Sequence, residues 1–241
     1  MTSGVDTAAF GIVTGLAFEA RIIEKARARA KRSAPPVACS GPGGERAAKA
    51  AEQLLDRGVI GLISFGLCAG LDPDLRPGTL LLAERVSAGA ESYAPDPTWR
   101  ARLAESLGAN GPSVAGGTLL GADAPIAGAE DKRALFAEQA VRALDMESHG
   151  VARVAARAGL PFVALRAVAD PAERNLPRAA LKAFGPDGRI KPLRALATMY
   201  LRPWESPGLL RLAYETRLAV DSLERAAVRL CDADAAPPGG G

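Results

Sequence analysis

The sequence contains little of what usually reveals a function directly. Its 241 residues include only three cysteines, one histidine and 5% aromatic residues. The cysteines, Cys39, Cys68 and Cys231, lie far apart, with neither an even count for disulfide pairing nor the spacing of zinc ligands. We therefore expect no disulfide framework and no metal site, in a protein of a reducing cytoplasm.

An excess of one charge and a long apolar run are absent as well. The 30 basic and 27 acidic residues leave a formal net charge of +3, without the basic stripe typical of a nucleic-acid-binding surface. The longest apolar run, 59–71, has 13 residues, too few for a helix that spans a bilayer, and the first ten residues do not resemble a signal peptide. These absences predict a soluble, cytoplasmic protein and leave peripheral contact with the inner membrane open.

Short buried strands alternate with amphipathic helices along the chain. This alternation predicts an α/β fold, a three-layer α/β/α sandwich around a mixed, mainly parallel sheet. We assign 9–231 to a single domain and the Pro- and Gly-rich 232–241 to a disordered tail. Strands are expected at 10–15, 35–41, 59–66, 78–86, 116–123 and 161–170, and helices at 18–32, 43–58, 97–107, 129–140, 147–158 and 207–230.

Acidic side chains follow several of the predicted strands. In open α/β sheets a ligand lies at the carboxyl ends of the strands. Glu19, Asp123, Glu147 and Asp170 stand at such ends, and a Gly-rich turn is expected after the 59–66 strand. The sequence therefore predicts a site where these carboxylates and the turn converge. The residues of the turn are Gly66, Ala69 and Gly70.

Each of these residues also has an ordinary structural explanation. Asp170 precedes Pro171 and suits a helix N-cap. Asp145 and Glu147 could complement the positive end of the next helix, and Glu19 could be a first-turn acid. The glycines do not form a dinucleotide fingerprint, because no helix follows them. The only histidine, His149, is expected to be a partly buried helix residue.

Taken together, the motifs resemble one family in order and spacing. Over about 10–172 the chain resembles the nucleoside phosphorylase and methylthioadenosine nucleosidase family, most specifically in its Asp-Met-Glu and Arg-x-x-x-Asp pieces. The later stretch LRPWESPGLLRLAYETRLA looks like the hopanoid-associated phosphorylase branch, which removes adenine from adenosylhopane. The earlier motifs are FGIVTGLAFEA, SGPGGERAAKAAEQLL, ISFGLCAGLDPDLRPGTLLLAE, GADAPIAG, ALDMESHGVARVA and FVALRAVADPA.

The resemblance implies an enzyme that cleaves the bond between ribose and a purine, without metal or redox cofactor. Asp170 would donate a proton to purine N7, which requires a raised pKa. Glu147 would accept hydrogen bonds from the ribose 2′- and 3′-hydroxyls, with Met146 against the ribose face. Glu19 matches the position that activates water in the nucleosidases.

The adenine side of the site follows from the same resemblance. Ile126 would offer its backbone to the adenine edge, beside Pro125. The turn 66–70 lacks the serine that many relatives carry near its second position, and Ala169 replaces a serine that is common before the acidic residue. The loss of these hydroxyls favours a substrate larger and more apolar than an ordinary nucleoside.

The nucleophile is left open by the sequence. The turn lacks the arginine that binds phosphate in true phosphorylases, which favours water. Arg21 and Arg46 are candidates for phosphate binding, and inorganic phosphate stays a candidate co-substrate. A general adenosine or methylthioadenosine nucleosidase, a purine nucleoside phosphorylase and a non-catalytic nucleoside-binding module remain alternatives.

The segment 174–211 mixes basic residues with large apolar ones. Such a composition is typical of a surface that meets lipid headgroups, and equally of a lid or a subunit interface. Since the family members are usually dimers or larger, we expect a homo-oligomer that binds a small or lipid-linked nucleoside.

Overall fold

The computed structural model describes residues 10–30, 35–108, 111–176, 206–231 and 235–237. The strands are β1 (Gly11–Thr14), β2 (Val37–Cys39), β3 (Leu62–Gly70), β4 (Leu80–Leu82), β5 (Arg85–Ala88), β6 (Glu91–Tyr93), β7 (Val114–Ala115), β8 (Thr118–Gly121), β9 (Val141–Asp145) and β10 (Phe162–Asp170). The helices are α1 (Ala17–Arg29), α2 (Gly44–Leu55), α3 (Pro97–Gly108), α4 (Ala129–Gln139), α5 (Ser148–Ala158) and α8 (Ser206–Cys231). None of the helices in these ranges is both long and apolar enough to cross a membrane.

The strands form one sheet with β3 and β10 at its centre. Its main path runs β6-β5-β8-β9-β3-β10-β4-β7, and β1 pairs with both β2 and β3. Within the described ranges, six of the nine strand pairings are parallel and three are antiparallel. The predicted mixed, mainly parallel sheet is confirmed.

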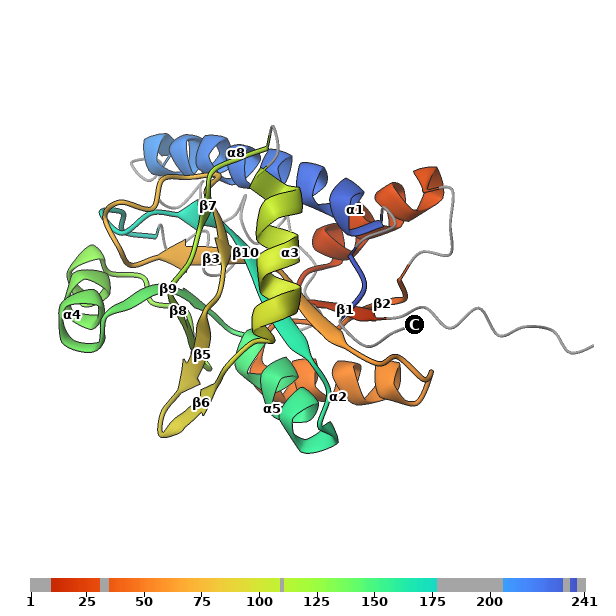
Figure 1. Cartoon of the computed structure of the whole chain (residues 1–241). Coiled ribbons are helices and arrows are strands. Elements are labelled where there is room, and N and C mark those ends of the chain that lie inside the picture. Colours follow the sequence, from red (N-terminus) through yellow and green to blue (C-terminus); the bar gives the residue numbers. More distant parts are fainter. Residues whose placement is uncertain (1–9, 31–34, 109–110, 177–205, 232–234, 238–241) are drawn as a thin grey trace, which may run out of the picture.

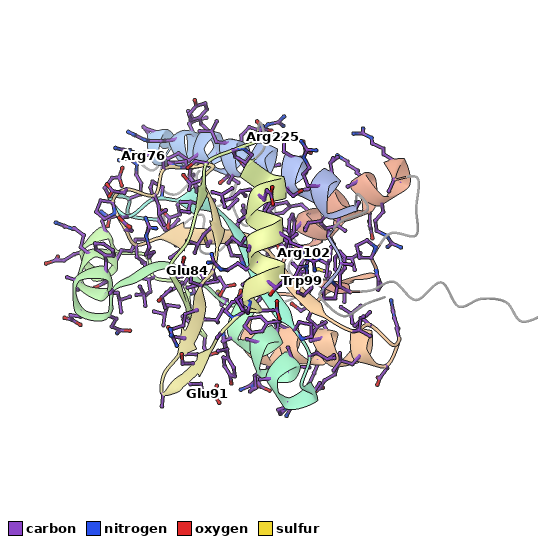
Figure 2. All side chains as sticks on the ribbon, in the orientation of Figure 1. Arg76, Glu84, Glu91, Trp99, Arg102 and Arg225 are labelled. Carbon is purple, nitrogen blue, oxygen red and sulfur yellow. The ribbon has the colours of Figure 1, made fainter. Side chains whose placement is uncertain are left out.

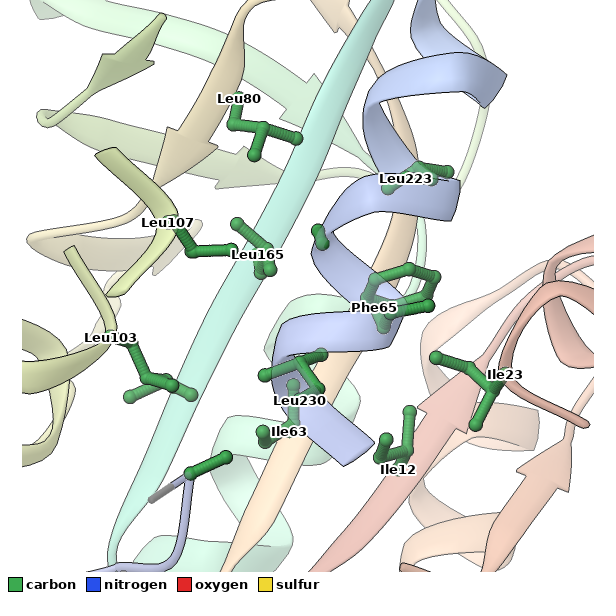
Figure 3. Packing of buried hydrophobic residues seen from close by; sticks show 14 of the residues in the cluster. Ile12, Ile23, Ile63, Phe65, Leu80, Leu103, Leu107, Leu165, Leu223 and Leu230 are labelled. Atoms are coloured by element: carbon green, nitrogen blue, oxygen red, sulfur yellow. The ribbon is translucent and has the colours of Figure 1, made fainter. Parts of the chain in front are cut away.

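Helices cover both faces of this sheet, which completes the predicted three-layer sandwich. Figure 1 shows α1 and α8 on one side and α2 and α5 on the other. Successive strand residues point to opposite faces. On β10, Val163 and Leu165 pack with α1, α3 and α8 (Figure 3), whereas Ala164 and Val168 pack with α2 and α5. Because both faces are covered, β10 is buried along its whole length.

The strand β3 is longer than predicted. The predicted strand ended at Gly66 and was followed by a turn at 66–70. In the structure, Gly66, Ala69 and Gly70 are strand residues. The prediction of a Gly-rich turn is therefore wrong. The strand continues because β10 pairs with it in parallel from Leu62 to Ala69 and provides backbone partners throughout.

Two strands meet end to end along one edge of β3. β1 runs parallel to its first part, with Val13 opposite Ser64, and β9 runs antiparallel to its last part, with Leu144 opposite Ala69. The carboxyl ends of β1 and β9 therefore face each other across the middle of β3. This differs from the expected common edge of parallel strands, because β9 has the opposite direction.

Part of the predicted disordered tail is packed against the fold. Ala235 is buried, and its carbonyl accepts a hydrogen bond of 2.7 Å from Trp99 Nε1. Arg102 donates to the Ala236 carbonyl at 2.8 Å; both donors lie on α3 (Figure 2). The tail prediction for 232–241 is wrong at 235–237, because a buried indole N–H requires an acceptor. The boundaries 9–231 stay a prediction, and most of 174–211 lies outside the described residues.

Candidate active site

A buried arginine stands at the centre of the site. Arg166 lies in the middle of β10 and is fully buried on the face covered by α2 and α5. Its Nη2 is 2.5 Å from Asp145 Oδ2 and donates to the hydroxyls of Ser64 and Ser148 at 2.6 and 3.1 Å. Its Nη1 lies 3.5 Å from Glu147 Oε2 and makes no hydrogen bond with any residue that the structure describes. The guanidinium thus retains an unused donor that points to the acidic side of the site.

Glu19 reaches this centre from the first turn of α1. Its Oε2 accepts the backbone N–H groups of Gly15 and Leu16 at 3.1 and 2.8 Å, and its Oε1 accepts that of Leu67 at 2.8 Å. Leu67 lies in the part of β3 between its β1 and β9 pairings. Glu19 therefore lies between the ends of β1 and β9. Through Gly15 and Leu16 it also caps the start of α1, as the third residue of a capping box does.

Glu147 enters from the opposite direction, directly before α5. Its Oε1 accepts the N–H of Gly43 at 3.3 Å. A Cβ on Gly15 would lie 2.7 Å from Glu147 Cδ, so only glycine allows this carboxyl to pack against the end of β1. Gly66 serves Arg166 and Glu19 similarly, since a Cβ there would lie 2.6 Å from Arg166 Nη1 and from Glu19 Oε1.

We call Arg166, Glu19, Asp145 and Glu147 the inner cluster. Burial raises the pKa of Glu19, against the opposing effects of Arg166 and of three backbone N–H groups. Burial also raises the pKa of Glu147; Arg166 opposes this, and Asp145 and Glu19 add to it. Burial is therefore the main reason why these two acids hold protons to higher pH than an ordinary glutamate, and neighbouring carboxylates contribute only at Glu147.

A second group of charges lies where β10 ends. Asp170 Oδ2 is 2.5 Å from the ammonium of Lys132 on α4, which is fully buried. Asp170 Oδ1 is buried and has no hydrogen-bond partner among the described residues. Burial raises the pKa of Asp170 to about 6, although Lys132 acts in the opposite direction. We call Asp170 and Lys132 the outer pair. In the structure Asp170 caps no described helix, because residues 171–176 form none.

Other predicted residues lie at or outside the edge of these groups. Met146 is partly buried between Asp145 and Glu147. Pro125 is exposed, while Ile126 is partly buried against Leu71, Val141 and Leu144. The loop that carries both is bonded to the segment that follows β10, where the Leu176 N–H donates to the Ala127 carbonyl at 2.9 Å.

Arg21, Arg46 and Asp123 do not belong to either group. Arg21 and Arg46 are exposed on α1 and α2, and their assignment to phosphate stays a prediction. The Asp123 side chain is exposed and lies 3.5 Å from Nε2 of His149. Among the described residues, no three His, Cys, Asp or Glu side chains are placed to hold a metal ion.

Arg166 and Lys132 were not among the site residues predicted from the sequence. A signal for Arg166 was present, because a charged residue inside an otherwise apolar buried strand requires acidic partners. Lys132 carried no comparable signal: it stands in a helix rich in charged residues, and its partner is 38 residues away in the chain.

The fold resembles solved nucleosidases. The 5′-methylthioadenosine/S-adenosylhomocysteine nucleosidase of Helicobacter pylori, solved with butyl-thio-DADMe-Immucillin-A, gives a TM-score of 0.68 at 16% identity over 92% of this chain and 95% of that one. The Neisseria meningitidis enzyme with methylthio-immucillin-A gives 0.68 at 15% identity, over 92% and 98%. Native futalosine hydrolase of Helicobacter pylori gives 0.60 at 20% identity, over 67% and 87%. At such identities the likeness shows the fold alone.

The sequence itself identifies the family. No curated protein matches it, but residues 19–199 match the family model of the phosphorylase superfamily. This match spans most of the chain, and it includes Glu19, the Asp-Met-Glu piece and the Arg166–Asp170 piece. The protein is therefore a member of the phosphorylase superfamily, and the predicted enzyme class, one that cleaves N-glycosidic bonds, is confirmed at the level of that family.

Proposed function

We propose that the protein cleaves the N-glycosidic bond of an adenine nucleoside. The observation that carries this proposal is the division of buried acids into two groups: the inner cluster around Arg166, and Asp170 with one oxygen unbonded. Cleavage of a glycosidic bond requires acid help for the leaving group and separate help for the sugar and its nucleophile. Two separate groups of buried acids, each with its own cation, could provide these two kinds of help.

Asp170 is the proposed acid for the leaving base. As the bond from ribose C1′ to purine N9 breaks, its electron pair goes to the purine, and N7 takes the proton from Asp170. With a pKa of about 6, a fraction of Asp170 is protonated at neutral pH, and proton transfer of this kind contributes roughly 10²- to 10⁴-fold to a rate. The Ile126 backbone, on the loop bonded to the end of β10, is the proposed contact for the adenine edge, beside Pro125.

The inner cluster is the proposed binding site of the ribose. In its ionised form Glu147 accepts the 2′- and 3′-hydroxyls, and its negative charge stabilises the positive charge that develops at C1′. Met146, next to it, packs on the ribose face. In its ionised form Glu19 takes a proton from the attacking water while the water oxygen bonds to C1′. The positive charge of Arg166 lies near both carboxylates and favours their ionised forms.

Water is the proposed nucleophile. Arg166 is already matched by Asp145 at 2.5 Å and is close to Glu147 as well, so a phosphate dianion would join a group that has excess negative charge. Inorganic phosphate as co-substrate, bound by Arg21 or Arg46, is the alternative. Reaction with and without phosphate, followed by a search for ribose 1-phosphate, decides between them: absence of this product in excess phosphate supports water.

The proposed substrate is adenosylhopane, a lipid-linked nucleoside. The resemblance of 201–219 to the hopanoid-associated branch supports it, as does the absence of side-chain hydroxyls at Ala69 and Ala169. Leu210 and Tyr214, one helical turn apart on α8, are 75% and 65% exposed and offer apolar surface to a lipid. On this proposal the enzyme works in the cytoplasm, at the inner membrane surface, as a homo-oligomer.

Adenine release from adenosine, methylthioadenosine and adenosylhopane tests the proposal. We expect the lipid to be cleaved fastest. Much faster turnover of methylthioadenosine would favour a general nucleosidase, and phosphate-dependent turnover a purine nucleoside phosphorylase. A non-catalytic nucleoside-binding module would bind these compounds and release no adenine. Asp170→Asn would then have no effect on turnover.

A further inference from the structure

Lys132 occupies a position where a lysine is costly. On α4 only Ala129 and Lys132 are buried, and their neighbours Glu130, Asp131 and Arg133 are exposed. Burial of an ammonium is strongly unfavourable unless it is paired and hydrogen-bonded. An alanine or leucine would satisfy the packing of α4 without that cost. The presence of a cation at this position therefore requires an explanation in what it contacts.

The contacts of Lys132 all lie in one short stretch of chain. Its Nζ donates to Asp170 Oδ2 at 2.5 Å, to the Pro171 carbonyl at 3.2 Å and to the Arg174 carbonyl at 3.1 Å. An ammonium has three donors, so these contacts use all of them. Lys132 thus fixes the turn after β10 and one oxygen of Asp170 at the same time.

The other charged and titratable groups near Asp170 act from further away. Glu215 on α8 raises the pKa of Asp170, and Arg174 on its own turn lowers it. Arg174 and Arg211 both pair with Glu215, at 3.3 and 3.1 Å. The thiol of Cys68 on β3 is also near, since Asp170 raises the pKa of that thiol.

The two oxygens of Asp170 are therefore not equivalent. Oδ2 is held by Lys132, whereas Oδ1 is buried and bonded to nothing in the described part of the chain. Ala169, the preceding residue, has no polar side chain that could orient the carboxyl in place of Lys132. A buried polar atom without a partner is rare in folded proteins and calls for a role.

We propose that Lys132 is the positioning residue of the leaving-group acid: it fixes Oδ2 of Asp170 and reserves Oδ1 for the purine. This inference rests on the proposed function, in which Asp170 protonates the departing base. Lys132 does not touch the substrate. It determines which oxygen carries the proton and at which pH the proton is present.

The charge of Lys132 has a consequence for the pH dependence of turnover. Burial raises the pKa of Asp170 to about 6, and Lys132 holds it from rising further. A leaving-group acid acts in its protonated form, so turnover falls as the pH rises through this pKa. Removal of the lysine charge raises the pKa, and the fall in turnover then moves to higher pH.

The experiment compares Lys132→Met and Lys132→Arg with the wild type, using the best of the three nucleosides named above. Lys132→Met is expected to lower kcat roughly 10- to 100-fold, part of the full effect of a general acid, and to move the fall in kcat upward by about one pH unit or more. Lys132→Arg keeps the cation, and its pH profile is expected to stay near that of the wild type. If Lys132→Met does not fold, Lys132→Gln, which keeps a donor without the charge, is expected to show the same shift.

Arg142→Met is the matched control. Arg142 on β9 also joins a carboxylate and a carbonyl, at 2.6 Å to Asp72 and 2.8 Å to Gly116, but it contacts neither the inner cluster nor the outer pair. Its loss is expected to lower the melting temperature and leave the pH profile of kcat unchanged. A shift in this control equal to that of Lys132→Met would overturn the assignment.

A second substrate separates positioning of the acid from general loss of structure. The nitrophenolate of 4-nitrophenyl β-D-ribofuranoside leaves without a proton, so Lys132→Met should retain most of its activity on this compound while losing it on the nucleoside. Equal losses on both substrates, or an unchanged pH profile in both Lys132→Met and Lys132→Gln, would show a merely structural lysine. If the wild type releases adenine from none of the three nucleosides, the proposed function itself fails.

Discussion

The inner cluster and the outer pair each hold carboxylates with a buried cation, but in different proportions. Arg166 faces three acids, Asp145, Glu147 and Glu19, and two serine hydroxyls. Lys132 faces one acid and two backbone carbonyls. The first group has an excess of negative charge and the second is balanced. In both groups burial is the main cause of the raised pKa values of Glu19, Glu147 and Asp170, and neighbouring carboxylates add to it at Glu147 and Asp170.

The two groups also occupy different places in the fold. Arg166 lies within the sheet, on a strand covered on both faces, where carboxylates arrive from the ends of β1 and β9. Lys132 comes from α4, a helix that lies beside β9, and its side chain reaches the end of β10. The inner cluster is thus built within the sheet, whereas the outer pair joins a helix to the end of a strand.

Loss of Arg166 is expected to have the largest effect. Arg166→Met leaves three buried acids without their cation, and removal of one partner of a buried ion pair costs about 3–5 kcal/mol. Urea unfolding should show this loss, together with loss of turnover. Arg157→Met, which removes an exposed ion pair with Glu52, is the control and should change stability by less than about 1 kcal/mol. A similarly small effect of Arg166→Met would mean that the inner cluster is not held by its cation.

Loss of the acid in the outer pair should affect turnover far more than stability. Asp170→Asn keeps the shape of the side chain but cannot donate a carboxyl proton, and we expect turnover to fall roughly 10²- to 10⁴-fold. Adenine release and a melting curve measure the two effects on the same sample. Full activity of a folded Asp170→Asn variant would show that Asp170 is not the general acid. The proposed difference in function between the two groups would then fail.

Glu147→Gln should separate function from stability within the inner cluster. Turnover should fall at least about tenfold, because a neutral amide stabilises less of the charge that develops on the sugar. The folded protein should become more stable, since burial of the charged form is no longer required.

The gain in stability from Glu147→Gln should depend on pH with a defined sign. Burial raises the folded-state pKa of Glu147, so the wild type loses stability as the pH rises from the ordinary pKa of a glutamate to this raised value. The amide does not titrate. The difference in melting temperature should therefore be larger at about pH 8 than at about pH 5. A constant difference would show that the charge of Glu147 is not the cause.

Regular elements of the fold were predictable because their patterns are local. The uniformly apolar β10 and the amphipathic α8 follow from the sequence alone. The predicted strand 78–86 is two strands, β4 and β5, which pair with different neighbours. That division depends on pairing with strands that are distant in the sequence, and the periodicity of a local stretch does not indicate such partners.

The sequence indicated three of the acids of the site, whereas both cations were missed, although Arg166 had a signal in its apolar strand. Glu19, Glu147 and Asp170 stand at element ends, where the fold class itself directs attention. Arg166 and Lys132 lie inside elements, and their partners come from other elements. The extension of β3 through Gly66 was missed for the same reason, since the glycine is required by Arg166 and Glu19 rather than by a turn.

His149 defines the boundary of the inner cluster, and its removal should have the smallest effect on turnover. It follows Glu147 closely in the sequence, but its Nε2 pairs with the exposed Asp123 at 3.5 Å. Its ring fills the space between Gly44 and Gly121, where an added Cβ would lie 2.0 Å from Nε2 and 2.4 Å from Nδ1. We expect His149→Ala to leave a cavity that costs about 1–3 kcal/mol of stability and to change turnover by less than about threefold. Denaturant unfolding and adenine release at one temperature measure both. A loss of turnover as large as that of Glu147→Gln, in a folded protein, would place the imidazole inside the cluster.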